Sequence, residues 1–185
     1  MRRVQRPGIA PLVMIGLWVP GSFTLFLPIG HAEETPRHAH FNDCGPEALS
    51  AALAERQVSV APEKIAELAG TDATGTTMLG LKRAAEALGV KAQGMRLSQA
   101  ELESYVEWGY GVIAFVHRNH YVWVRRIHPK GVVLKDVGPG FHVIPHEQWY
   151  AMWFESKRGK PPAPEEGRGL CLVLAPHPTT NGQLR

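Results

Sequence analysis

Cysteine is scarce in this chain of 185 residues, which contains only Cys44 and Cys171. Two cysteines can form at most one disulfide, so a small domain held together by several disulfides is excluded. The sequence also has no internal repeat, no coiled-coil heptad and no long low-complexity tract, which excludes repeat and fibrous folds. With 44% hydrophobic and 20% charged residues, the composition is that of one globular domain with a single core.

A basic surface is also missing from the body of the chain. The formal net charge is +3, but three arginines lie in the first 32 residues, a segment that contains no acidic residue. The remaining chain has 17 basic and 17 acidic residues. No stripe of basic residues with interleaved aromatics stands out, so we expect no nucleic-acid partner.

The first 32 residues have the composition of an export signal. A short basic region, MRRVQR, precedes an apolar stretch from Ile9 to Ile29, and small residues at Gly30 and Ala32 fit cleavage after Ala32. The apolar stretch is about 20 residues long, enough to span a bilayer, so an uncleaved N-terminal membrane anchor is the alternative. Both readings place the rest of the chain outside the cytoplasm, either periplasmic or secreted.

Helical patterns dominate the first half of the expected domain, residues 33–176. Pro46 suits a first helical turn because its missing N–H would be unpaired there anyway, and the apolar residues after it recur at helical spacing. The capping-box pattern of Ser98 and Glu101 predicts a further short helix. The expected helices begin near Cys44, run from Pro62 to about Ala69, run from Thr76 or Thr77 to Gly89, and begin after Ser98.

Strand patterns dominate the second half. Segments rich in β-branched and aromatic residues alternate with turn residues and predict sequential, antiparallel strands. A short helix, HEQWYAMWF, and a loop, KRGKPPAPEEGRG, precede a last strand that closes the sheet, and a disordered tail is expected at 177–185. Helices followed by a sheet indicate the α+β class. The expected strands are 90–97, YGVIAFV, HYVWVRRI, GVVLKDV, FHVIP and LCLVLAP.

Cys44 lies in FNDCGPEALSAAL, at the start of the first expected helix. Unpaired N–H groups and the helix dipole favour a negative group at that place, which lowers the pKa of a thiol and stabilises the thiolate. The same N–H groups can stabilise the oxyanion that forms on an attacked carbonyl. We therefore interpret Cys44 as a nucleophile, and a thiolate nucleophile needs an imidazole and a group that orients it.

His120 and Asp136 are the best candidates for these partners. His120 begins one expected strand and Asp136 ends the next, and the residues IHPKG between them carry turn signals. A hairpin folded about His128 would place His120 directly opposite Asp136, with the two β-carbons about 5 Å apart. A register displaced by one residue would put the two side chains on opposite faces of the sheet.

The stretch from DCGPEALSAALAERQVSV to GVKAQGMRLS, followed by NHYVWV and KDV, resembles the double-glycine leader peptidase family. These papain-like cysteine peptidases are best known as N-terminal domains of bacteriocin-exporting ABC transporters, and the resemblance covers about residues 38–154. It implies a papain-like fold with Cys44 as nucleophile, His120 as acid and base, and Asp136 as the orienting acid. It also implies cleavage after a Gly-Gly pair in leader peptides, with no cofactor.

The sequence departs from the family at the oxyanion hole. The family has a glutamine six residues before the cysteine, and this chain has His38 there, with His40 and Asn42 as possible substitutes. We expect His38 to be the second oxyanion donor, because the Asn42 amide is close enough to Cys44 to cap the helix instead. The sequence also contains no six-helix membrane region and no phosphate-binding glycine loop, so a stand-alone exported member without a fused transporter is expected.

Three other interpretations compete with this one. Cys44 and Cys171 could form a disulfide in an oxidising compartment, and the His38-x-His40 pair could bind zinc, although no second ligand cluster has convincing spacing. The alternative function is a catalytically weak papain-like domain that binds a peptide or protein partner, which the missing glutamine favours. The principal hypothesis is a cysteine peptidase that acts on a peptide or protein substrate.

Overall fold

The computed structural model describes residues 43–154 and 166–176. The expected export signal or anchor at 1–32, the tail at 177–185, and the residues His38, His40 and Asn42 lie outside the described residues. Among the helices that are described, none is long and apolar enough to cross a membrane. The predicted limits of the domain and its predicted export therefore stay predictions.

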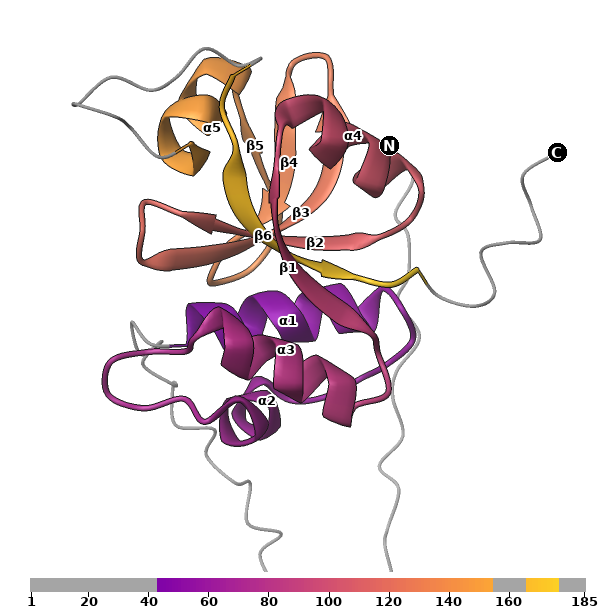
Figure 1. Cartoon of the computed structure of the whole chain (residues 1–185), viewed down its shortest axis with the longest axis vertical. Helices are drawn as coiled ribbons and strands as arrows, with labels where there is room; N and C mark the ends of the chain where they lie inside the picture. The colour runs from indigo at the N-terminus through magenta and orange to yellow at the C-terminus, as the bar shows by residue number, and fades with distance from the viewer. Residues whose placement is uncertain (1–42, 155–165, 177–185) are drawn as a thin grey trace, which may run out of the picture. The chain divides into compact units, whose positions relative to one another are not determined.

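The described chain contains five helices and six strands, drawn in Figure 1. An element lies in each segment where the sequence patterns predict one, and β1 begins two residues later than the expected Val90. The helices are α1 (Cys44–Ala54), α2 (Pro62–Ala69), α3 (Met78–Ala87), α4 (Gln99–Glu107) and α5 (His146–Trp153). The strands are β1 (Ala92–Leu97), β2 (Gly111–Val116), β3 (His120–His128), β4 (Gly131–Lys135), β5 (His142–Ile144) and β6 (Gly169–Leu174).

Local capping explains where several helices begin and end. The predicted capping box is present at α4, since the Ser98 side chain accepts from the Glu101 N–H and the Glu101 carboxylate accepts from the Ser98 N–H. The Thr77 hydroxyl accepts the Gly80 N–H at the start of α3. Gly70 ends α2 in the left-handed conformation, with φ of 66°, which glycine adopts without steric cost.

The six strands form one antiparallel sheet in the order β1-β6-β2-β3-β4-β5. The last strand, which the sequence was expected to use to close the sheet, lies in its interior, between β1 and β2. Because β1 and β2 both run antiparallel to β6, they are parallel to each other, and α4 provides the long connection that parallel strands require. The nearly complete burial of β6 fits this interior position.

Helices cover both faces of the sheet (Figure 1). The core between α1, α2, α3 and the sheet contains Leu172 and Leu174 of β6, whereas the core beneath α4 and α5 contains Cys171 and Val173. This alternation is the two-residue period of a strand buried on both faces. Cys44 belongs to the first core and Cys171 to the second, so the two thiols lie on opposite sides of the sheet and both are free. The disulfide interpretation is therefore wrong.

Arg56, at the C-terminal end of α1, is a buried cation with only 6% of its surface exposed. Its guanidinium donates to the carbonyl oxygens of Ala52 at 2.7 Å, Gly109 at 3.1 Å and Ala175 at 3.2 Å. Burial lowers its pKa from the ordinary 12.5. Gly111 leaves space for this group, because a β-carbon there would lie 2.7 Å from Nη2 of Arg56. One side chain thus connects α1, the α4–β2 turn and the end of β6.

We expect Arg56→Ala to lower the free energy of unfolding by about 2–4 kcal/mol, since it leaves buried carbonyls without a charged donor. Urea denaturation measures the change. Arg83→Ala is the matched control: Arg83 is exposed on α3, and its removal should change stability by less than about 0.5 kcal/mol. Equal effects of the two substitutions would contradict a structural role for Arg56.

Candidate active site

Cys44 is the first residue of α1, and it is buried, with 7% of its surface exposed. Asp43 occupies the N-cap position, but its side chain makes no capping hydrogen bond. The first N–H groups of the helix are therefore not occupied by the Asp43 carboxylate and can stabilise negative charge next to the thiol. The predicted setting of Cys44 at a helix start is present in the structure.

His120 and Asp136 are brought together beside it. Nε2 of His120 lies 2.6 Å from Oδ1 of Asp136, and the same carboxylate oxygen accepts the Val137 N–H at 2.6 Å. Since Asp136 occupies Nε2, the other ring nitrogen, Nδ1, remains for Cys44, which forms a hydrogen bond with His120. The three side chains thus form one hydrogen-bonded series.

These contacts shift both pKa values toward a thiolate–imidazolium pair. Burial raises the pKa of Cys44, but hydrogen bonds from the His120 side chain and the Tyr121 backbone outweigh it, so the pKa lies below the ordinary 9.0. The hydrogen bond with Cys44 raises the pKa of His120 to about 9; burial opposes this rise, and the hydrogen bond to Asp136 supports it. Both shifts favour the thiolate–imidazolium pair over the neutral thiol and imidazole.

The register of β3 and β4 differs from the sequence prediction. The hairpin turn is Pro129-Lys130, with His128 opposite Gly131, rather than a fold about His128. Farther from the turn, Trp123 lies opposite Lys135. In the same register the next position of β4, Asp136, lies opposite Val122, which makes it a diagonal neighbour of His120. Direct opposition was therefore wrong, but diagonal neighbours share a face and long side chains can span them.

A β-bulge keeps the two side chains on the same face. Near the turn Arg126 pairs with Val133, whereas beyond it Val124 pairs with Leu134, so that Arg125 is an extra residue without a partner. If Arg125 were instead paired with Leu134, the pairing near the turn would continue, Asp136 would lie opposite Trp123, and His120 and Asp136 would be on opposite faces. The bulge therefore compensates for the position of the turn.

Insertion of one alanine between Lys135 and Asp136 should lower kcat by at least about 10²-fold, since it would move Asp136 by one position along β4, away from the face of the imidazole. Arg125→Ala is the matched control, because it removes the ion pair to Glu55 at 2.9 Å and the contact with the Phe141 ring but keeps the residue count. It should retain most of the activity. Peptide hydrolysis and circular dichroism of both variants measure the effect, and similar kinetics in the two variants would contradict the bulge argument.

Gly45 allows the close packing that fixes Cys44 against the sheet. A β-carbon on Gly45 would lie 3.2 Å from side-chain atoms of Leu81, Thr76 and Tyr121, closer than ordinary contact. A cavity of about 320 Å³ opens next to Cys44. It is lined by Cys44, Thr74, Gly75, Thr76, Thr77, Phe115, Arg118, Asn119 and Tyr121.

One wall of this cavity is the loop between α2 and α3. Oδ1 of Asp72 accepts the N–H of Thr74 at 2.7 Å and its hydroxyl at 2.6 Å, and Asp72 and Gly75 exchange backbone hydrogen bonds. Sequence reasoning missed this wall, although the turn-forming composition of TDATGTT just before a helix is a usable signal. It also missed Phe115 and Arg118, which come from the β2–β3 hairpin.

The residues that the structure describes do not include the candidates for the second oxyanion donor or for the zinc ligands. His38 and Asn42, the two candidate donors, lie outside the described residues, and so does His40. Within residues 43–154 and 166–176, no group of three or more His, Cys, Asp or Glu side chains could hold a metal ion.

Comparison with known proteins identifies relatives by sequence. The sequence model described as Peptidase C39 family matches residues 35–156, which include Cys44, His120 and Asp136. An uncharacterized protein of Methanothermobacter marburgensis is 38% identical over 100 residues. That match covers 52% of this chain and 66% of the relative, just under two thirds of its length.

Two solved peptidase domains have a similar structure. One is a double glycine motif protease from an AMS/PCAT transporter in complex with the leader peptide, with a TM-score of 0.58 at 23% identity, covering 72% of this chain and 84% of that one. The other is the peptidase domain of Streptococcus ComA, a bi-functional ABC transporter involved in quorum sensing, with a TM-score of 0.59 at 24% identity over 73% and 92%. The predicted α+β, papain-like fold is confirmed.

Proposed function

Because this chain belongs to the Peptidase C39 family, whose model matches it over residues 35–156, we propose that it is an active cysteine peptidase with a Cys44–His120–Asp136 triad. The observation that carries the proposal is the hydrogen-bonded series of these three side chains at the start of α1. A cysteine at a helix start, an imidazole and an orienting carboxylate are the parts that thiol-dependent acyl transfer requires.

In the proposed reaction, the Cys44 thiolate attacks the carbonyl carbon of the scissile bond and forms a sulfur–carbon bond. The imidazolium of His120 then donates its proton to the departing amine as the carbon–nitrogen bond breaks, which leaves a thioester. Neutral His120 next takes a proton from water, and the hydroxide attacks the thioester to release the acid and the thiolate. Asp136 keeps the ring oriented and stabilises its charged form in each step.

We propose peptides with a Gly-Gly pair as the substrate class. The double glycine motif protease in the comparison contains a bound leader peptide, and the cavity of about 320 Å³ beside Cys44 leaves space for a peptide next to the thiol. No metal or organic cofactor is needed for this chemistry.

Incubation with synthetic peptides that contain Gly-Gly, and with matched peptides that contain Val-Val, tests the proposal. Mass spectrometry of the products should find cleavage after Gly-Gly and little or none after Val-Val. Cleavage of both at equal rates would contradict the substrate class. A folded protein that cleaves neither peptide, and whose Cys44 reacts slowly with iodoacetamide at pH 6, would instead favour the peptide-binding alternative.

The oxyanion hole leads to a separate prediction, because His38 stands where the family has glutamine. We propose that the Cys44 N–H and the His38 ring N–H bind the developing oxyanion. His38→Ala should then lower kcat by roughly 10²-fold, and His38→Gln should retain or improve it. Asn42→Ala is the competing test: loss in this variant, with wild-type kcat in His38→Ala, would assign the donor to Asn42.

A further inference from the structure

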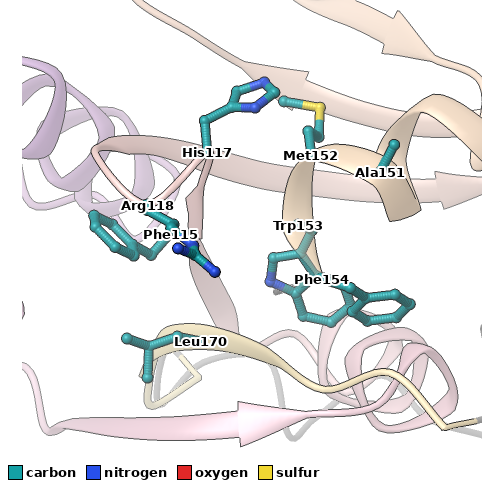
Figure 2. A pocket seen from close by; sticks show the side chains of 8 residues that line it. All are labelled: Phe115, His117, Arg118, Ala151, Met152, Trp153, Phe154 and Leu170. Carbon is teal, nitrogen blue, oxygen red and sulfur yellow. The ribbon is translucent and has the colours of Figure 1, made fainter. Parts of the chain in front are cut away.

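A second cavity adjoins the one at Cys44. It has a volume of about 180 Å³ and lies beside α5 (Figure 2). Phe115 and Arg118 line both cavities, so the two spaces are neighbours that share these side chains. The remaining lining residues are His117, Ala151, Met152, Trp153, Phe154 and Leu170. A substrate bound at Cys44 can therefore extend a group past Phe115 and Arg118 into this second cavity.

Arg118 is held at the boundary by an unusual backbone turn. His117 and Arg118 have φ of 50° and 64°, the left-handed region that residues other than glycine adopt at a cost. The turn is fixed by the Asn119 N–H, which donates to the Val116 carbonyl, and by the His117 N–H, which donates to the Met152 carbonyl at 2.8 Å. The strained turn is therefore anchored to α5.

The guanidinium of Arg118 has no anionic partner among residues 43–154 and 166–176. Figure 2 shows its end between Phe115 and Trp153, with the nitrogen edge of the indole facing the same space. The indole nitrogen is buried and makes no regular hydrogen bond among the described residues; the Cys171 thiol, a weak acceptor, is its neighbour. Because the backbone at Gly169 covers the indole nitrogen, only the guanidinium can receive an anionic acceptor from the cavity.

The other side chains around the cavity are mostly apolar. An unpaired guanidinium beside an apolar cavity matches a ligand with a short apolar stem and a carboxylate end, because Arg binds carboxylates through paired N–H groups. We propose that Arg118 is a specificity-determining residue that selects peptides with a carboxylate seated in the cavity beside α5. This inference rests on the proposed peptidase function, and it adds a preference for acidic substrates.

Two alkylating reagents test the charge preference without a peptide substrate. Iodoacetate and iodoacetamide both form a thioether with Cys44 and release iodide, but only iodoacetate has a carboxylate. The rate constant of iodoacetate at Cys44, divided by that of iodoacetamide, should fall about fivefold in Arg118→Gln and further in Arg118→Glu. Arg126→Gln is the matched control, because Arg126 is exposed on β3 and lines neither cavity. An unchanged ratio in Arg118→Glu would overturn the proposal.

Peptide turnover identifies the source of the carboxylate. Gly-Gly peptides with an acidic residue near the scissile bond should be preferred over neutral ones in kcat/KM, and Arg118→Glu should reverse the preference toward lysine. If amidation of the peptide C-terminus leaves the preference intact, the carboxylate is a side chain; if amidation abolishes it, the terminal carboxylate is the ligand. Equal kcat/KM for acidic and neutral peptides in the wild type would contradict the inference. If the wild type cleaves no peptide, the peptidase proposal fails, while the alkylation ratio still decides the role of Arg118.

Discussion

Replacement of Cys44 by alanine should abolish peptide hydrolysis, with a fall in kcat of at least about 10⁴-fold. The reason is that the thiolate supplies the bond to the scissile carbonyl, and no neighbouring group can replace it. The variant should remain folded, because alanine removes one sulfur atom from the margin of the core that contains Cys44. Circular dichroism checks the fold, and mass spectrometry of the peptide products checks the activity.

Cys171→Ala provides the matched control for this substitution. Cys171 is fully buried in the core beneath α4 and α5, and burial raises the pKa of its thiol. It is therefore protonated and inert at neutral pH. Its replacement should lower stability by about 1 kcal/mol through a small cavity and leave kcat within about twofold of wild type. A comparable loss of activity in the two folded variants would contradict Cys44 as the sole nucleophile.

Replacement of His120 by alanine should lower kcat by about 10³–10⁴-fold, because general acid–base catalysis is lost together with the activated thiolate. The second effect can be measured without a substrate. In the wild type, the hydrogen bond from His120 opposes the burial that raises the pKa of Cys44. Without the imidazole, burial should dominate and the pKa should rise. The rate of iodoacetamide labelling at pH 7 should therefore fall by at least about tenfold.

The pH dependence of the wild type provides a further check on the same pair. The proposed reaction requires the thiolate and the imidazolium together. The rate should therefore rise as the pH passes the lowered pKa of Cys44, below its ordinary 9.0, and fall as His120 loses its proton near pH 9. In His120→Ala the labelling rate should have one ascending limb, displaced to higher pH. Identical labelling profiles for the two proteins would rule out activation of Cys44 by His120.

Patterns that depend on neighbouring residues predicted the fold well. The Ser98–Glu101 capping box, the Gly70 stop and the strand composition are local signals, and each produced an element within about two residues of its predicted limits. The position of β6 was less predictable, because pairing between distant strands depends on the whole sheet and not on a short pattern.

The candidate site also has one feature that a local pattern predicts and others that depend on distant pairing or unusual backbone angles. The setting of Cys44 at a helix start follows from the Gly-Pro that comes after it. The diagonal contact of His120 with Asp136 depends on the bulge at Arg125, and no residue type at that position signals an extra residue in the strand. The position of Arg118 depends on a hairpin turn with left-handed φ angles at His117 and Arg118. Sequence rules expect glycine, asparagine or aspartate in such a turn, so they did not predict it here.

The interior position of β6 also determines when the protein can fold. Strands β1 and β2 leave the ribosome long before residues 169–174, yet each uses one edge to pair with β6. Until the last strand arrives, those edges remain unpaired and the core beneath α4 and α5 lacks Cys171 and Val173. Folding of the sheet should therefore wait until β6 has been synthesised, and it is dominated by contacts between distant parts of the chain, which makes it slow. A nascent chain that has not yet synthesised residue 169 should consequently be protease-sensitive, and its sheet should become protected only after β6 is present.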